Sequence, residues 1–352
     1  MKILDEKMII AGPCSAESYE QLEIIAQALV ELGIKKMRLG AWKPRSRPNS
    51  FEGHGVKAIE WAREIQSNFG VEVFTEVNFP EDVECCLENN IQSFWIGART
   101  TTNPFMVSKL AKSFEGREVR NIIVKNPIAP DLKLWIGAIE RLSGVTDNIF
   151  ACLRGFSTYS LSGFRNEPLW DIAVELKKKF PTLQTLVDPS HISGDKLLIN
   201  DSCQMAMDFN FDGLMIEVHP RPQEALSDSE QQIDLNEFKT LLSNLEVKTN
   251  IDKDSSISKD IAEELSRARA EIQLIDEEVL SLLLARLNLS KEISLIKKQY
   301  GLSVLSLSQF DACLRSRISE GEKIGLPREL SEKYYRLIHS YSIKSQSLNT
   351  SL

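Results

Sequence analysis

The stretch MIIAGPCSAES, residues 8–18, begins as a short apolar run of strand character and then breaks into small, turn-forming residues. A single cysteine, Cys14, follows directly after the run. A lone cysteine in this position is most often a small core residue. It can also present a soft metal ligand at the edge of a sheet, and the rest of the sequence has to decide between these interpretations.

Seven further apolar runs alternate with amphipathic helical patterns such as QLEIIAQALVELG. The eight runs are MIIAG (8–12), KMRLGA (36–41), VEVFTEV (71–77), SFWIGA (93–98), NIIVKN (121–126), IFACLRG (149–155), TLVDPS (185–190) and GLMIEVH (213–219). Eight alternations of strand and helix within about 250 residues predict a TIM (β/α)8 barrel. A doubly wound open sheet is the alternative, although it usually has fewer strands and no GxGxxG motif follows the first run.

The C-terminal part of the chain has a different composition. Fourteen of the 17 glycines and 12 of the 13 prolines precede residue 250, and nothing from Ile257 to Tyr300 breaks a helix. Apolar residues recur every three or four positions from Leu265 to Ile296, and Arg286 is the one charged member of this seam. We therefore predict a barrel over 1–245, a polar linker over 246–259 and an all-α, three-helix domain over 260–352. A helical homodimer would cover the seam.

Composition and charge exclude several classes of function. The 352 residues carry a net charge of −8, which argues against nucleic acid as a partner. Six cysteines, two of them adjacent at 85 and 86, do not form the pattern of a disulfide framework. The N-terminus is too charged for a signal peptide, and no stretch approaches the roughly 20 apolar residues of a spanning helix. We expect a cytoplasmic protein that binds neither nucleic acid nor membranes.

Basic residues gather at the predicted carboxyl ends of the strands, where a TIM barrel carries its chemistry. They are Arg38, Lys43, Arg45, Arg99, Lys125 and Arg154. A solvated surface explains one or two of them, but an acidic protein has no general reason to place so many cations at one end of a barrel. Because arginine and lysine suit phosphate and carboxylate, the set predicts a ligand with several anionic groups, such as two phosphates and a carboxylate.

A second set of strand-end residues has the chemistry of a metal site. Cys14, His191, Glu217 and Asp228 offer a thiolate, an imidazole and two carboxylates, which are ligands for a borderline divalent transition metal. Each residue alone is weak support. A barrel would bring all four to one mouth, because they follow separate strands. The pattern therefore predicts a metal site.

Seven motifs in the first part resemble those of the type I DAHP synthases, in particular their beta branch. They are AGPCSAES (11–18), MRLGAWKPRS (37–46), IGARTT (97–102), CLRG (152–155), VDPSH (187–191), GLMIEVHP (213–220) and EALSD (224–228). This family makes the first committed compound of the shikimate pathway to the aromatic amino acids. The resemblance implies condensation of phosphoenolpyruvate with erythrose 4-phosphate. It also implies a metal, expected to be manganese with iron, cobalt or zinc as alternatives, held by the four residues above.

The resemblance also implies roles for the basic residues. Arg99 and Arg154 would bind the phosphate of phosphoenolpyruvate. Its carboxylate would be bound by Arg38, Lys43 and Lys125. The sugar phosphate would be bound by a motif made of Lys43, Arg45 and Ser46, so that Lys43 is also a catalytic candidate.

Two alternatives stay open within this fold. One is the eight-carbon sugar acid synthase that uses arabinose 5-phosphate, which the KPRS run at 43–46 disfavours. The other is a metal-free phosphosugar aldolase with Lys125 as a Schiff-base amine. The two differ in the aldehyde accepted and in the need for a metal.

The second part resembles the all-helical chorismate mutases over SRARAEIQLIDEEVLSLLLARLNLSKEISLIKK (266–298) and SIKSQ (342–346). The resemblance implies that Arg269 and Arg286 hold the two carboxylates of chorismate, while Lys297 and Gln346 donate to the ether oxygen. Helical spacing agrees, because Lys297 is three turns from Arg286 and Ser342 shares a face with Gln346. Arg269 is roughly 100° around from Arg286, and the family pattern has it reach into the partner subunit's site.

Together the two resemblances imply a bifunctional enzyme whose synthase is inhibited by prephenate or chorismate through the helical domain. The alternative is a helical domain that only senses a ligand or dimerises, as a coiled-coil seam with an interfacial arginine would. Ser306, Gln309 and Phe310 stand where relatives often carry charged residues. These three positions therefore motivate the alternative.

Overall fold

Eight parallel strands close into a barrel in the order β1 to β8. They are β1 (Met8–Gly12), β2 (Lys36–Leu39), β3 (Glu72–Glu76), β4 (Ser93–Ile96), β5 (Asn121–Lys125), β6 (Ile149–Leu153), β7 (Gln184–Val187) and β8 (Gly213–Glu217). Each strand coincides with one of the apolar runs that the sequence predicts to be strands. The TIM-barrel prediction is therefore confirmed, and the open-sheet alternative is wrong.

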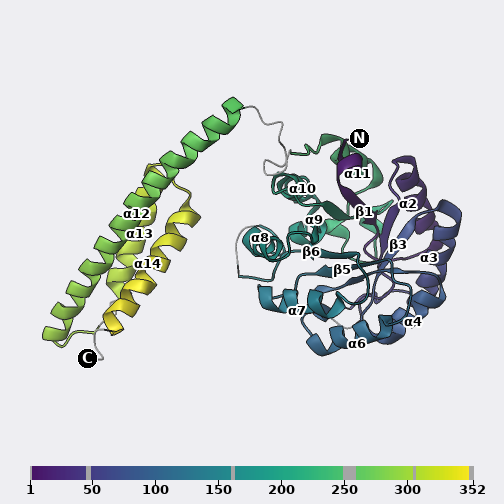
Figure 1. Cartoon of the computed structure of the whole chain (residues 1–352), viewed down its shortest axis with the longest axis horizontal. Helices are drawn as coiled ribbons and strands as arrows, with labels where there is room; N and C mark the ends of the chain where they lie inside the picture. The colour runs from purple at the N-terminus through teal and green to yellow at the C-terminus, as the bar shows by residue number, and fades with distance from the viewer. Residues whose placement is uncertain (1, 45–48, 160–162, 249–258, 304–306, 349–352) are drawn as a thin grey trace. The chain divides into compact units, whose positions relative to one another are not determined.

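This computed structural model describes residues 2–44, 49–159, 163–248, 259–303 and 307–348. The chain divides into two units, Met1–Asp252 and Lys253–Leu352, both visible in Figure 1. Residues 249–258, most of the predicted linker, lie outside the described residues. The boundaries predicted at 245 and 260 stay predictions.

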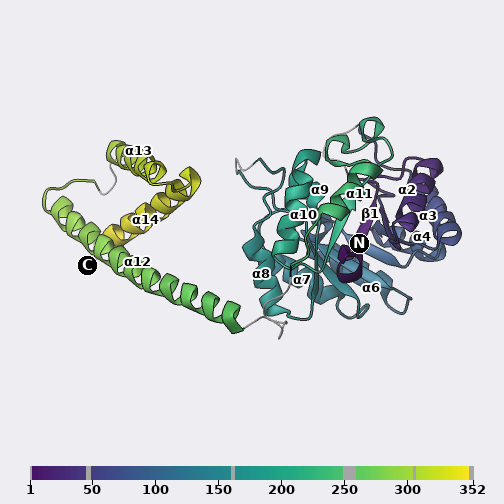
Figure 2. The ribbon, with the colours of Figure 1, turned by 90° about the horizontal axis from the view of Figure 1, so that it is seen from above.

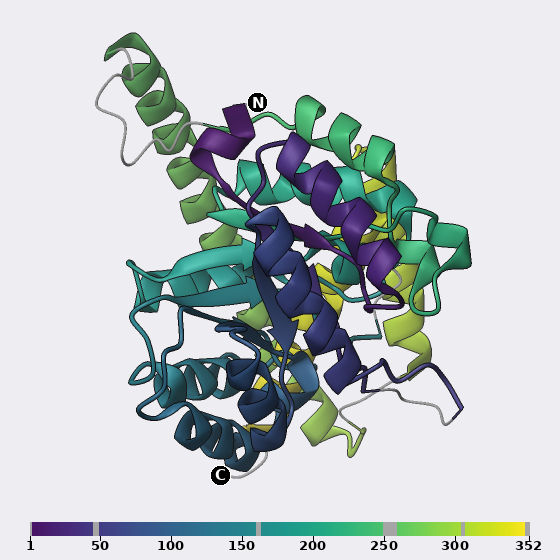
Figure 3. The ribbon, with the colours of Figure 1, turned by 90° about the vertical axis from the view of Figure 1, so that its right-hand side faces the viewer.

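Helices surround the strands on the outside of the barrel (Figures 2 and 3). They are α1 (Lys2–Glu6), α2 (Tyr19–Glu31), α3 (Val56–Phe69), α4 (Pro80–Glu88), α5 (Ala98–Thr101), α6 (Pro104–Phe114), α7 (Leu132–Leu142), α8 (Trp170–Lys179), α9 (Pro189–Ser193), α10 (Ile199–Asp208) and α11 (Leu235–Asn244), with short 3-10 turns η1 (Lys196–Leu198), η2 (Pro222–Glu224) and η3 (Ser229–Gln231). Local signals set several helix starts. Ser18 caps α2 by accepting from the Gln21 amide, and Asp234 with Glu237 forms a capping box at α11.

The inside of the barrel is layered because strand side chains alternate between its two faces. A polar layer at the amino ends joins Glu72 to Ser93 and Asn121 at 2.6 Å each. A buried apolar layer lies above it and consists of Ile10, Phe74, Trp95, Ile123, Phe150, Cys152, Leu186 and Met215. The next inward positions on several strands are the charged residues predicted to form the site. Lys125, for example, stands two residues after Ile123, and Glu217 two after Met215.

Glycines at the strand ends let neighbouring backbones approach. A Cβ on Gly12 would lie 2.0 Å from the Arg38 carbonyl oxygen, and one on Gly213 would lie 2.2 Å from the Met8 carbonyl oxygen. Both contacts are with backbone, so a larger residue would force the strands apart. These glycines keep β1 against β2 and β8, and so set how closely their terminal residues gather.

The C-terminal unit consists of three helices, α12 (Lys259–Gln299), α13 (Leu307–Lys323) and α14 (Arg328–Leu348). This confirms the predicted all-α domain. Both α12 and α13 pack against α14. The side of α12 that is buried carries Ser290 and Ser294, whereas most of its large apolar residues are exposed. No helix in the described ranges is both long enough and apolar enough to cross a membrane.

Candidate active site

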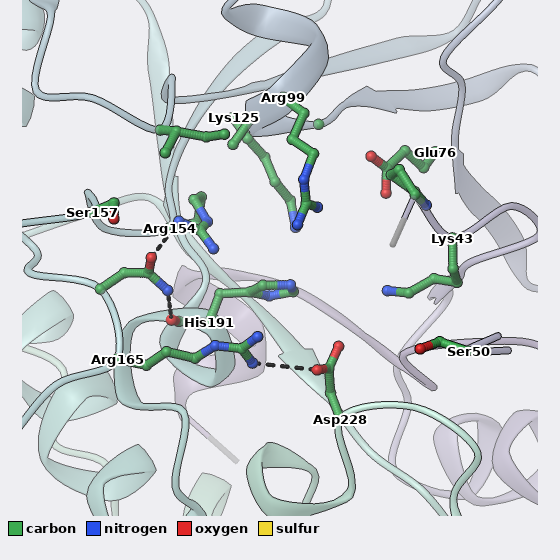
Figure 4. Close-up of a pocket in the computed structure, with 15 residues that line it drawn as sticks. Lys43, Ser50, Glu76, Arg99, Lys125, Arg154, Ser157, Arg165, His191 and Asp228 are labelled. Carbon is green, nitrogen blue, oxygen red and sulfur yellow. Dashed lines mark hydrogen bonds and ion pairs between the residues drawn. The ribbon is translucent and has the colours of Figure 1, made fainter. Parts of the chain in front are cut away.

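A cavity of about 550 Å³ opens at the carboxyl ends of the strands (Figure 4). Six of the predicted site residues line it, namely Lys43, Arg99, Lys125, Arg154, His191 and Asp228. In Figure 4 the side chains of Arg99, Arg154 and Lys43 point toward the same space, with His191 at its centre. Arg45 and Ser46 lie outside the described residues. Cys14, Arg38 and Glu217 are fully or almost fully buried and are not among the residues lining the cavity.

Asp188 is the anion that organises the floor of this cavity. Its carboxylate is fully buried and accepts from Lys125 Nζ at 2.6 Å, while Arg38 Nη1 lies 3.8 Å away. Arg38 donates its other terminal nitrogen to Glu217 at 2.9 Å. Burial opposes ionisation of Asp188. The charges of His191, Lys125 and Arg38 favour ionisation more strongly, and so hold the pKa of Asp188 well below the usual range. The floor is therefore a network of fixed charges.

Trp95 lies beneath these cations. The Arg38 guanidinium carbon is 5.0 Å from the Trp95 ring centroid, and Lys125 Nζ is 5.4 Å from it. The ring face attracts both charges. The apolar layer thus ends in an aromatic surface that supports the charged layer directly.

The wall of the cavity is strongly cationic. Arg154 donates from Nη1 to Asn166 at 2.8 Å, and its amide donates to Asn126 Oδ1 at 2.7 Å. Burial lowers the pKa of the Arg154 guanidinium to about 10; Asp188 opposes this, and the charges of Arg165 and Arg99 add to it. The Arg99 and Arg165 guanidinium groups therefore lie close enough to repel that of Arg154, and the fold holds them together against this repulsion. An anionic ligand would relieve that repulsion.

The four candidate metal ligands lie in two pairs. The Cys14 thiol donates to Asp228 Oδ2 at 3.2 Å. His191 Nδ1 lies 3.8 Å from Glu217 Oε1, and 2.8 Å from Asp188 Oδ2 without the alignment of a hydrogen bond. Among the described residues, no group of three or more such donors reaches the spacing that holds an ion.

The two pairs are nevertheless neighbours, and their donors suit a divalent cation. Burial, followed by the charge of Glu217, raises the pKa of the Cys14 thiol to about 12, and the charge of His191 contributes to the low pKa of Asp228. The Lys43 ammonium donates to Cys14 Sγ at 3.0 Å. A cation therefore already lies among the thiol and carboxylates. Thiolate, imidazole and two carboxylates are the donor types that borderline divalent metals prefer, so the residues present fit such an ion.

Sequence reasoning did not assign roles to several residues of this site. Asp188 had a visible signal, because it stands in VDPSH directly after a strand. Arg165 and Gln231 had none. Arg165 pairs with Asp228 at 3.3 Å, and Gln231 donates to Glu217 Oε2 at 2.6 Å. Arg165 and Asp228 are 63 residues apart on separate loops, and Gln231 follows the end of β8 by 14 residues, so only the folded barrel reveals the two contacts.

The helical unit holds a second polar cluster. Arg286 Nη1 donates to Ser342 Oγ at 2.9 Å, and Ser290 Oγ lies 3.2 Å from the same hydroxyl. Arg269 lies 17 residues from Arg286 on one continuous helix, which is about 25 Å at 1.5 Å per residue. The arginines therefore do not meet within one chain.

The structure describes only some of the other predicted site residues of the helical unit. The side chain of Gln346 and all of Ser306 lie outside the described part of the structure. Gln309 is exposed, and Phe310 stacks on His339. Lys297, on α12, acts electrostatically on the same histidine as Arg286 does.

A closed parallel barrel with cations around a buried acidic floor defines a (β/α)8 enzyme that acts on anionic substrates. The chain belongs to the DAHP synthetase I family, whose model matches residues 4–253. The chorismate mutase type II model matches residues 268–347. The chain thus carries a DAHP synthase domain, a transferase, and a chorismate mutase domain, an isomerase.

Individual relatives agree with the barrel assignment. Phospho-2-dehydro-3-deoxyheptonate aldolase of Thermotoga maritima is 37% identical over 237 residues, covering 66% of this chain and 67% of the relative. A 2-dehydro-3-deoxyphosphooctonate aldolase of Azoarcus is 27% identical over 260 residues, covering 67% of this chain and 88% of the relative. A crystal structure of the Thermotoga maritima DAHP synthase superposes with a TM-score of 0.61 at 33% identity, covering 67% of each chain.

Removing the central anion should destabilise the barrel. We expect Asp188→Asn to lower the free energy of unfolding by about 3–5 kcal/mol, because Lys125 and Arg38 stay buried without their shared counterion. Lys125→Met should cost less in the Asp188→Asn background than alone, with a coupling of about 1 kcal/mol or more. Urea unfolding followed by tryptophan fluorescence measures this for the barrel, since all five tryptophans precede residue 252.

The exposed pair Glu175–Lys178, 2.6 Å apart, provides the matched control. Glu175→Gln and Lys178→Met should be additive within about 0.5 kcal/mol, because exposed ion pairs contribute little. The same additivity at Asp188 and Lys125 would contradict a buried charge network.

Proposed function

We propose that the barrel condenses phosphoenolpyruvate with erythrose 4-phosphate to DAHP and phosphate, and that the helical domain rearranges chorismate to prephenate. The observation that carries the first activity is the crowding of Arg99, Arg154 and Arg165 in a cavity above a buried carboxylate. Membership of the DAHP synthetase I family gives this anion site its substrate class. We further propose that both reactions take place in the cytoplasm.

Phosphoenolpyruvate carries a phosphate and a carboxylate on neighbouring carbons, so it needs two groups of cations. In our proposal Arg99 and Arg154 bind the phosphate, while Lys43 and Lys125 bind the carboxylate. Paired guanidinium donors match phosphate geometry, and the dry acidic floor keeps the lysines in position. Arg38 is buried beneath the cavity and would act on the carboxylate through the network that it shares with Lys125.

Erythrose 4-phosphate would bind next to phosphoenolpyruvate, with its phosphate on the motif of Lys43, Arg45 and Ser46. Cys14, His191, Glu217 and Asp228 would hold a divalent transition metal, with manganese favoured over iron, cobalt and zinc. When bound, such an ion polarises the aldehyde toward attack by the enolpyruvate carbon. Positive charge then develops at the enol ether carbon, water adds there, and phosphate leaves by C–O cleavage. The cations bound to that phosphate stabilise the leaving group.

Chelation should separate the two activities. A chelator is expected to abolish the synthase reaction, and added Mn²⁺ to restore it, because polarisation of the aldehyde depends on the metal. Chorismate rearrangement in the same sample serves as the internal control and should not change. A synthase that keeps full activity in excess chelator would disprove metal dependence.

The choice of aldehyde tests the alternatives. Erythrose 4-phosphate should be turned over and arabinose 5-phosphate should not. Turnover of the five-carbon sugar alone would assign the enzyme to the eight-carbon sugar acid synthases, as the Azoarcus relative is described. Borohydride trapping of substrate on Lys125 would support the metal-free aldolase.

For the helical domain we propose that Arg286 and the partner subunit's copy of Arg269 bind the two carboxylates of chorismate. Lys297 and Gln346 would donate to the ether oxygen, where negative charge grows as the C–O bond breaks. Ser342 fixes the Arg286 guanidinium, as their 2.9 Å hydrogen bond indicates. The rearrangement needs no covalent group, only a polar site that holds the compact conformer.

A homodimer through α12 is part of this proposal. The seam residues Ile272, Ile275, Leu282, Leu289 and Ile296 are each 55–62% exposed in a single chain. Apolar side chains that recur at helical spacing over the length of α12 need a partner surface, and a second copy of α12 supplies the matching one. The same pairing would bring Arg269 of one chain toward Arg286 of the other.

Complementation between two inactive variants tests the shared site. Arg269→Ala and Arg286→Ala should each lose mutase activity. Co-expression should restore about a quarter of the wild-type rate, because half of the dimers are mixed and each of these has one intact site. No recovery in verified mixed dimers would place both arginines in one chain's site.

We also propose feedback, because the two reactions are separated by several steps and their fusion suits control of the first by a later product. Saturating prephenate or chorismate should slow the wild-type synthase and leave the synthase of Arg286→Ala unchanged. Initial rates of phosphoenolpyruvate consumption measure this. An unaffected wild-type rate would rule out feedback, and feedback without mutase turnover would favour a helical domain that only senses its ligand.

A further inference from the structure

His339 and Phe310 form a contact in the helical unit to which neither resemblance nor the proposed reaction assigns a role. Their ring centroids are 4.1 Å apart and the ring planes meet at 23°, which is a stacked arrangement. His339 is on α14 and Phe310 is in the first turn of α13. The stack therefore fixes the orientation of the imidazole from a neighbouring helix.

His339 shares a face of α14 with residues of the proposed mutase site. Positions 339, 342 and 346 follow the i, i+3, i+7 spacing that places residues on one side of a helix. Ser342 contacts Arg286 at 2.9 Å. His339 is therefore one turn from a residue that already orients the chorismate-binding arginine.

One nitrogen of His339 is left without a partner. Among the described residues, its Nε2 atom is buried and makes no hydrogen bond. A buried polar atom without a hydrogen bond costs about 1–3 kcal/mol. Such an atom beside two cations is suited to contact a ligand that arrives with negative charge.

The charges that reach His339 come from one helix. Burial lowers the pKa of the imidazole, and the positive charges of Arg286 and Lys297 on α12 lower it further. The contact from α13 is the apolar ring of Phe310. The unliganded imidazole is therefore biased toward its neutral form near pH 7.

We propose that His339, oriented by Phe310, is a ligand-binding residue of the mutase site and contacts an anionic group of a dicarboxylate through Nε2. This proposal rests on the proposed mutase function. It adds one ligand-binding residue to the site and one proton that is taken up when the ligand binds. A bound dianion offsets the charges of Arg286 and Lys297, so the imidazole takes up a proton as the ligand binds. The proton comes from solvent and is released when the ligand leaves. Binding is therefore tighter at lower pH.

Calorimetric titration of the full-length protein with prephenate tests this. Measured in buffers of different ionisation enthalpy near pH 7, the binding heat should report net proton uptake approaching one per site. The affinity should fall by up to about tenfold per pH unit as pH rises from the pKa of the free imidazole toward that of the complex, and level off above it. His339→Gln keeps a hydrogen-bond donor but cannot titrate, so uptake and pH dependence should both disappear.

Two further variants make the result specific. His54→Gln alters an exposed histidine of the barrel and should behave as wild type. Phe310→Leu keeps an apolar side chain without the stack, and should weaken binding by about threefold to tenfold.

The possible failures are distinct. Binding without proton uptake in the wild type overturns the role of His339 and leaves the mutase proposal intact. An equal loss of affinity at every pH in His339→Gln, with uptake retained, shows a structural role and also overturns it. Absence of both prephenate binding and chorismate turnover refutes the mutase function itself.

Discussion

The active site depends on one buried carboxylate, that of Asp188, at the carboxyl end of β7. It keeps Lys125 and Arg38 together in a place where water does not screen their mutual repulsion, and the His191 imidazole lies against it. Without this anion, Lys125 and Arg38 would not be held in place beneath the arginines of the cavity wall. The cavity can remain strongly positive, and so attract phosphorylated molecules, because the charge beneath it is balanced.

The barrel converts a simple sequence pattern into this arrangement. Every strand except β2 carries an inward apolar residue and, further along, an inward charged or small one. Ile123 is followed by Lys125, Leu186 by Asp188 and Met215 by Glu217. Closure of the sheet brings these second residues to one level. Alternation along separate strands, read from sequence, therefore predicts both the apolar layer and the position of the charged one.

Sequence could predict what lies on strands and helices, since periodicity and strand ends are local properties. All eight strands, the long helix and six residues of the cavity were accessible in this way. Contacts made by residues outside the strands and long helices were not, because no periodicity links Arg165 to Asp228 or Gln231 to Glu217. The same limit hid His339, whose relation to Phe310 depends on how α13 packs on α14. The apolar seam of α12 is exposed in a single chain, and the helical pattern predicted that such a seam needs a partner surface.

Trp95 gives the site a built-in optical signal. Its indole ring is 1% exposed and lies directly under a guanidinium and an ammonium group. The emission of a buried indole responds to the electric field of nearby charges. Entry of a phosphorylated molecule changes that field without any movement of the ring. Occupancy of the barrel should therefore change the intrinsic fluorescence, against the background of the other four tryptophans.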